Sequence, residues 1–205
     1  METAGRNVAD FLLQTYPNIE RFLILCGPGN NGGDGLVAAR YLTFAGKTAR
    51  ILFAEPTDQF KGDAKLNFKL IQKQGLPTEI FDGKALSDET NQFLAGGAII
   101  VDALLGTGVR AKLKEHFETL LDLLRQKHNM VVAVDMPSGL LGDTGAVLSR
   151  PLKCEYTVTF HLPKLCHFIT PAARFCGQVV VSDIHIYKSI AERQGVKTEI
   201  LTDEL

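Results

Sequence analysis

A glycine-rich stretch at residues 26–36, with the sequence CGPGNNGGDGL, constrains the fold of this chain more than any other feature. It follows the apolar residues 22–25 and precedes a second apolar segment at 37–42, so it is predicted to join a buried strand to a helix. Glycines let the backbone come close to a ligand. Because amides at a helix start point outward and the helix dipole favours an anion there, the stretch predicts a site for a phosphate-bearing small molecule.

The stretch contains the G-x-G-x-x-G spacing of a dinucleotide fingerprint at residues 27–32, and Glu55 stands near the position of a ribose-binding acid. Two features argue against that interpretation. Asp34 places a carboxylate beside the expected phosphate site, and Asn30 and Asn31 add amide side chains where small or apolar residues are usual. The fingerprint alone therefore does not identify a dinucleotide-dependent dehydrogenase.

A cation site is the interpretation that fits these polar residues better. Side-chain and backbone oxygens around Asn31 are ligands that a cation accepts, and a bound cation would offset the charge of Asp34 and help to hold an anion. The alternative for Asp34 is a plain N-cap of the following helix.

Composition limits the class of protein. The chain has 205 residues, 45% of them hydrophobic, and a net charge of −1. This is enough for one domain over residues 1–205, with the polar residues from about 190 to 205 as a C-terminal extension or linker. Charges are spread along the chain, so no nucleic acid is expected as a partner. No apolar run is long enough for a membrane span, and the start does not resemble a signal peptide, so a soluble cytoplasmic protein is expected.

Cysteine usage agrees with a cytoplasmic location. The four cysteines are scattered, without a C-x-x-C pair and without histidines at metal-binding spacing. We therefore expect reduced thiols that mostly fill the core. They are Cys26, Cys154, Cys166 and Cys176.

Strands and helices are predicted to alternate along the chain. Apolar or β-branched runs predict strands, and segments with helical spacing of apolar residues predict helices between them. The expected strands are 22–26, 48–54, 78–81, 98–102, 131–135, 156–160 and 178–182, and the expected helices are 6–16, a segment ending near 45, 60–74, 87–94 and 114–127. This order indicates an α/β fold with a parallel sheet covered on both faces.

Polar groups follow three of the expected strands. The glycine-rich stretch follows the first strand, and Asp102 and Asp135 end two later ones. Carboxyl ends of parallel strands meet at one edge of a sheet, where ligands bind at the point at which strand order reverses. One aspartate at a strand end is often only a turn residue. Two such acids together with the glycine-rich stretch predict a shared site.

The chain resembles the YjeF N-terminal domain family, whose characterised enzymes are NAD(P)H-hydrate epimerases. The resemblance rests on residues 26–35 (CGPGNNGGDG), 101–108 (VDALLGTG) and 134–139 (VDMPSG). Residues 4–6 (AGR), 157–160 (TVTF) and 163–164 (PK) support it. It implies a Rossmann-like three-layer αβα sandwich with a mostly parallel sheet, usually a homodimer, that interconverts the R and S forms of hydrated NADH and NADPH. A dehydratase domain or partner is a further implication.

The resemblance also implies site residues. Asn31, Asp102 and Ser138 match the potassium (K+) ligands of the family, and Asp135 matches an acid that contacts the substrate. For Lys164, where the family tends to have lysine, a solvated loop side chain is the alternative. The implied substrate-binding residues are Asn30, Asn31, Gly32, Gly33, Asp34, Gly106, Thr107, Gly108, Val109, Arg110, Ala111, Lys112 and Asp135.

A mechanism follows from the chemistry of the implied substrate. Hydrated nicotinamide carries a hydroxyl on the carbon beside the ring nitrogen, and epimerisation requires this hydroxyl to leave and return on the opposite face. A positioned carboxylic acid suits both steps, and Asp135 is the candidate catalytic residue. The rival hypotheses are a redox dehydrogenase that binds ribose through Glu55, a dimerising scaffold of the same fold, and a domain that binds a nucleotide without turning it over.

Overall fold

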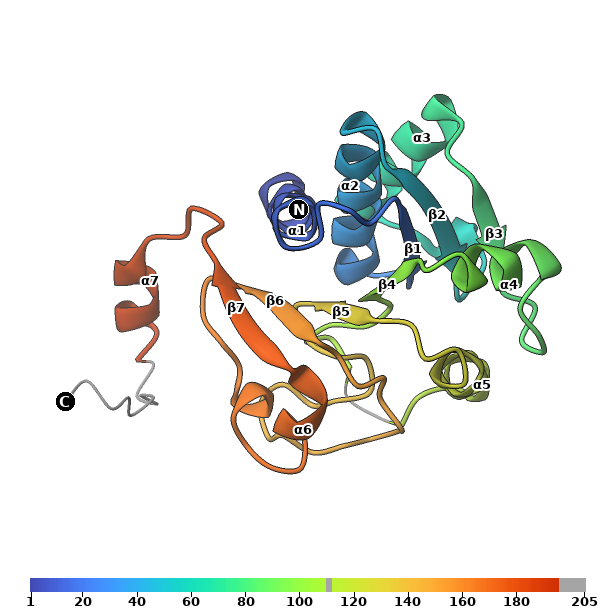
Figure 1. Ribbon diagram of the computed structural model, residues 1–205. Coiled ribbons are helices and arrows are strands. Elements are labelled where there is room, and N and C mark those ends of the chain that lie inside the picture. Colours follow the sequence, from blue (N-terminus) through green and yellow to red (C-terminus); the bar gives the residue numbers. More distant parts are fainter. Residues whose placement is uncertain (110–111, 196–205) are drawn as a thin grey trace.

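The computed structural model describes residues 1–109 and 112–195, and Figure 1 shows the arrangement of their helices and strands. The described residues form one seven-stranded sheet in which every pairing is parallel. The strands are β1 (Arg21–Cys26), β2 (Thr48–Phe53), β3 (Thr78–Ile80), β4 (Ile99–Ala103), β5 (Val131–Val134), β6 (Tyr156–Phe160) and β7 (Gln178–Ser182). The predicted parallel α/β sheet is confirmed.

Helices connect the strands. The α-helices are α1 (Glu2–Thr15), α2 (Asn30–Phe44), α3 (Gly62–Gln74), α4 (Asp88–Ala95), α5 (Glu115–Arg125), α6 (Ala173–Cys176) and α7 (Lys188–Arg193), and the 3-10 helices are η1 (Thr57–Gln59) and η2 (Leu165–His167). The tail predicted as an extension thus contains part of α7, and residues 196–205 lie outside the described residues.

Side chains alternate between two cores along the central strands. On β1, Phe22 and Ile24 pack into a core with residues of α1, α2 and α3, whereas Leu23 and Leu25 pack into a second core with residues of α4 and α5. The two-residue period of a strand produces this alternation. The sheet is therefore the middle of three layers, as the sandwich prediction requires (Figure 1).

The strand order is β3-β2-β1-β4-β5-β6-β7, so the chain runs outward in one direction from β1 to β3 and in the other from β4 to β7. The order reverses between β1 and β4, which pair in parallel with Leu25 opposite Asp102. In open parallel sheets, the carboxyl ends of two such strands leave room for a ligand.

Two helix starts differ from the predicted ones. The first helix begins at Glu2 instead of residue 6, and α2 begins at Asn30, inside the glycine-rich stretch. Gly5 lets the two helices pack closely, because a side chain there would meet the Asp34 carbonyl oxygen at 2.4 Å. The close packing of α1 on α2 outweighs the low helix propensity of glycine.

The other structural expectations concern membranes and cysteines. No helix within residues 1–109 and 112–195 is both long and apolar enough to cross a bilayer. All four cysteines are free thiols and buried, which confirms that they fill the core.

Candidate functional site

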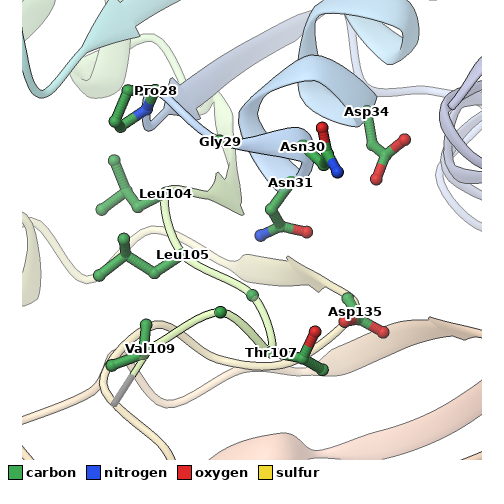
Figure 2. A pocket seen from close by; sticks show the side chains of 12 residues that line it. Pro28, Gly29, Asn30, Asn31, Asp34, Leu104, Leu105, Thr107, Val109 and Asp135 are labelled. Atoms are coloured by element: carbon green, nitrogen blue, oxygen red, sulfur yellow. The ribbon is translucent and has the colours of Figure 1, made fainter. Parts of the chain in front are cut away.

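A pocket of about 490 Å³ opens where the strand order reverses. Its walls come from the start of α2, the segment after β4 and the end of β5 (Figure 2). The lining residues are Pro28, Gly29, Asn30, Asn31, Asp34, Leu104, Leu105, Gly106, Thr107, Gly108, Val109 and Asp135. The structure thus brings the glycine-rich stretch and Asp135 together at one site.

Two glycines bring the walls of this pocket close to each other. A Cβ on Gly27 would lie 1.9 Å from the Leu104 carbonyl oxygen, and one on Gly32 would lie 1.9 Å from the Gly27 carbonyl oxygen. Neither position therefore accepts a side chain unless the backbone moves. Helix α2 begins at Asn30, and the N-cap Gly29 before it has no capping side chain. Its first-turn amides have no partners within the helix and are available to an anion in the pocket.

Asp34 lies within α2 and is not its N-cap, so the capping alternative is wrong. Its side chain lines the pocket, and one carboxylate oxygen lies 3.9 Å from the Met1 amino nitrogen. Burial raises the pKa of Asp34 to about 7, with a further increase from the charge of Asp135 and a decrease from the Met1 amino group. Asp34 is therefore a pocket carboxyl that exchanges its proton near neutral pH.

Asp102 and Ser138 are in direct contact beside the pocket. The Ser138 hydroxyl donates to Oδ1 of Asp102 at 2.6 Å, and the Ser138 backbone N–H donates to Oδ2 at 2.9 Å. The Leu104 N–H also donates to Oδ1, at 3.2 Å. Asp102 is completely buried, and this burial raises the pKa of its carboxyl.

Asn31 packs against the same segment. A Cβ on Gly106 would lie 3.3 Å from the Asn31 Cβ, and the neighbouring Leu105 N–H donates to the Ser138 hydroxyl at 3.0 Å. The Asn31 Nδ2 is buried and has no hydrogen-bond partner among the described residues. The three predicted potassium ligands therefore surround the chain between Leu104 and Gly106. Within residues 1–109 and 112–195, no cluster of His, Cys, Asp and Glu side chains forms a site for other metals.

The backbone at Asp135 turns sharply at the end of β5. Its φ is 67°, in the left-handed region, and the Met136 N–H donates to the Val134 carbonyl at 2.8 Å. Such a three-residue turn is rare for a residue with a side chain and costs free energy that the surroundings must offset. The Asp135 N–H, which donates to the Val158 carbonyl at 2.8 Å, is one of these stabilising contacts.

The Asp135 carboxylate is part of a polar cluster with residues on and after β6. Its Oδ1 accepts from the Lys164 ammonium and, at 3.0 Å, from the Thr159 hydroxyl. Lys164 also donates to the Thr159 hydroxyl at 2.7 Å. Lys164 is thus an ion-pair partner of Asp135 and not a solvated loop lysine.

Some predicted substrate-binding residues lie elsewhere. Gly32 packs against Gly27 and Gly33 against Met1 and Ala64, and neither is among the lining residues. The Lys112 side chain is 76% exposed, and its ammonium lies 3.8 Å from a Glu118 carboxylate oxygen, away from the pocket. Arg110 and Ala111 lie outside the described residues.

Glu55 does not line the pocket either. It accepts a hydrogen bond from Lys114, and the His116 Nε2 lies 3.3 Å from the same carboxylate oxygen. The acid that a dehydrogenase would use for ribose is therefore occupied by residues at the start of α5.

Sequence reasoning missed several residues of the site. Pro28, Leu104 and Leu105 line the pocket; they stand in the segments that carry the family resemblance but were not among the implied substrate-binding residues. Thr159 and His167 both contact Asp135, and His167 reaches its carbonyl oxygen at 3.0 Å. The two residues stand in or near the TVTF and PK segments, which was the signal that could have identified them.

Comparisons with known proteins found similar chains over most of these residues. Residues 1–166 match the family described as YjeF-related protein N-terminus. The chain is 36% identical to an NAD(P)H-hydrate epimerase of Rhodopirellula baltica, over 91% of this chain and 74% of that protein. It is also 36% identical to a bifunctional NAD(P)H-hydrate repair enzyme of Thermofilum pendens, over 97% of this chain but only 38% of that longer protein.

A solved structure supports the fold. The crystal structure of the yeast protein ynu0 superposes with a TM-score of 0.77 at 22% identity, covering 99% of this chain and 86% of the yeast chain. At this identity the similarity shows the fold alone.

Proposed function

The chain belongs to the YjeF-related N-terminal family, and from this premise we propose that it is an NAD(P)H-hydrate epimerase that interconverts the R and S forms of hydrated NADH and NADPH. One observation carries the proposal. The pocket at the point where the strand order reverses is lined by the start of α2 and by Asp135, which forms an ion pair with Lys164. Relatives of comparable length, from Rhodopirellula baltica and Pirellula staleyi, bear the name of this activity.

The first part of the proposal concerns substrate binding. The amides at the start of α2, together with Asn30 and Asn31, would hold the phosphate region of the dinucleotide. The segment from Gly106 to Val109 would line the rest of the substrate. A neutral Asp34 would not repel the phosphates, and its raised pKa supports this role.

The second part concerns chemistry. The substrate hydroxyl takes up a proton and leaves as water while the ring nitrogen donates its lone pair to form a carbon–nitrogen double bond. Water then attacks the opposite face of the same carbon and loses a proton. Asp135 would exchange these protons, with Lys164 as the ammonium partner that shares them. The Thr159 hydroxyl would keep both groups in place.

The third part is a bound potassium ion. Asn31, Asp102 and Ser138 fit such an ion, because each carries a side-chain oxygen and, among the described residues, Asp102 is a buried carboxylate with no ion pair. Potassium takes oxygen ligands of this kind. When bound, it would neutralise Asp102 and add positive charge beside the phosphate region. A rise in melting temperature with potassium chloride over sodium chloride, lost in Asp102→Asn, is the expected readout.

The fourth part concerns partners and location. We propose a homodimer, and a dehydratase domain or partner as the second component of repair, since the chain spans only 38% of the length of the bifunctional relative from Thermofilum pendens. Four free cysteines support a reducing compartment such as the cytoplasm. Light scattering of the purified protein would test the dimer.

The experiment that tests the activity starts from one purified epimer of NADPH hydrate. Chromatography should show the other epimer forming faster with the protein than without it. A scaffold or a domain that only binds the nucleotide would leave the rate unchanged, and a dehydrogenase would instead change the absorbance of NADPH in the presence of an oxidised substrate.

A further inference from the structure

His167 connects Asp135 and Lys164, the two members of the ion pair at the pocket, through their backbones. Its Nδ1 accepts the Lys164 backbone N–H at 3.0 Å, and its Nε2 lies 3.0 Å from the Asp135 carbonyl oxygen. The side chain is 4% exposed, so water has little access to either contact. One imidazole thus spans from the end of β5 to the start of η2.

The partners of His167 determine its tautomer. A backbone N–H can only donate, so Nδ1 must be the unprotonated acceptor. A carbonyl oxygen can only accept, so Nε2 must carry the proton. The neutral Nε2–H form satisfies both contacts, whereas the other neutral tautomer satisfies neither.

The contact between His167 and the Asp135 carbonyl oxygen matters because of the backbone conformation of Asp135. Asp135 adopts a φ of 67° in a tight turn, a conformation that persists only where neighbours stabilise it. The bond from His167 meets the carbonyl of that turn, while the side chain of the same residue pairs with Lys164.

We infer that His167 is a positioning residue that holds the Asp135 carboxylate and the Lys164 ammonium in register through the backbone of each. The inference rests on the proposed function, because it assigns His167 a role in the same reaction. His167 itself does not line the pocket, so it acts through Asp135 and not on the substrate.

If His167 only capped η2, its substitutions would have different effects. His167 accepts the N–H of Lys164, the N-cap of η2, as a capping side chain would. A cap would need only the Nδ1 contact, whereas positioning of Asp135 needs the Nε2 contact. Replacing the imidazole by amides of two lengths separates the contacts, since Asn places its oxygen near Nδ1 and Gln places its nitrogen near Nε2.

The test compares His167→Gln, His167→Asn and His167→Phe in the assay with one purified epimer. We expect His167→Gln to keep kcat within about threefold, whereas His167→Asn and His167→Phe lose about tenfold to a hundredfold with KM changed by less than about threefold. The exposed His128→Gln is the control, and melting curves confirm that each variant is folded. Full activity in His167→Phe, or rescue by Asn and not by Gln, would overturn the inference.

NMR of the wild-type protein tests the same contacts without turnover. Nitrogen shifts of the His167 ring should show the Nε2–H tautomer, and the carboxyl carbon shift of Asp135 at one fixed pH should change in His167→Asn relative to the wild type, but not in His167→Gln. The Nδ1–H tautomer, or an unchanged Asp135 carboxyl carbon shift in all variants, would refute the role of His167. Wild-type protein without epimerase activity but with these spectra would refute the proposed function and leave the contacts of His167 established.

Discussion

The Ser138 hydroxyl donates a hydrogen bond of 2.6 Å to the buried Asp102 carboxylate, although the two residues are 36 positions apart in the chain. The contact joins the ends of β4 and β5 behind the pocket. A second bond, from the Leu105 N–H to the same hydroxyl, extends it to the pocket wall. Ser138 therefore links a buried charge to the segment that lines the site.

Replacing Ser138 by Ala should destabilise the protein. Asp102 would lose a donor and the Leu105 N–H its acceptor, which we expect to lower the free energy of unfolding by about 1–3 kcal/mol in urea denaturation. Ser149→Ala is the matched control, because the buried Ser149 hydroxyl has no hydrogen-bond partner in the part of the chain that the structure describes. Equal losses in the two variants would show that the Asp102 contact contributes nothing.

Replacing Asp34 by Asn should change how stability depends on pH. The pKa of Asp34 is raised from 3.8 to about 7, so between these values the folded state holds a proton that the unfolded state releases. The contribution of Asp34 is therefore fully present below pH 4 and is lost as pH rises through 7. At about 1.4 kcal/mol per pH unit, the loss amounts to at most about 4 kcal/mol.

Urea denaturation across this pH range measures the effect of Asp34 as the difference between wild type and Asp34→Asn. This difference isolates Asp34, because the raised pKa of Asp102 makes the free energy of unfolding of both proteins fall with rising pH. Parallel stability curves for the two proteins would mean that Asp34 is already ionised in the folded state at acidic pH.

Replacing Gly32 by Ala should disrupt the start of α2. The new Cβ would lie 1.9 Å from the Gly27 carbonyl oxygen, so the backbone of the pocket wall has to move. We expect a loss of about 3 kcal/mol or more of unfolding free energy. Gly108→Ala should cost far less, because no atom of the described residues lies within 4 Å of the place that its Cβ would take. Similar melting temperatures for both variants would contradict the close approach.

Replacing Glu55 by Gln should leave substrate affinity within about twofold of wild type. Glu55 is occupied by Lys114 and does not line the pocket. A small loss of stability, of about 1 kcal/mol, is expected from the weakened ion pair, because its Lys114 side is exposed to solvent. A large rise in KM for the hydrate would restore the ribose-binding interpretation of Glu55.

The sequence predicted the parts of the fold that depend on local patterns. Apolar runs located all seven described strands, and the two strand-end acids identified the edge that carries the site. The sequence did not predict features that depend on packing between helices and strands. The low helix propensity of its glycines hid the start of α2 at Asn30, where Gly32 packs closely against the Gly27 carbonyl oxygen.

The sequence also could not show in which direction a side chain points. Gly106 and Lys112 stand in one segment, yet only the first lines the pocket, because the Lys112 side chain turns toward Glu118. Lys164 was ambiguous as a loop lysine until the turn at Asp135 placed a carboxylate beside it. Side-chain contacts that the local pattern does not specify decide both cases.

The most direct measurement is epimer interconversion by Asp135→Asn. Starting from one purified epimer of NADPH hydrate, the wild type should form the other, and Asp135→Asn should lose at least about a hundredfold in kcat, since removal of a positioned acid–base group costs that much. Both proteins should bind potassium alike. Full activity in Asp135→Asn, or no interconversion by the wild type, would contradict the account.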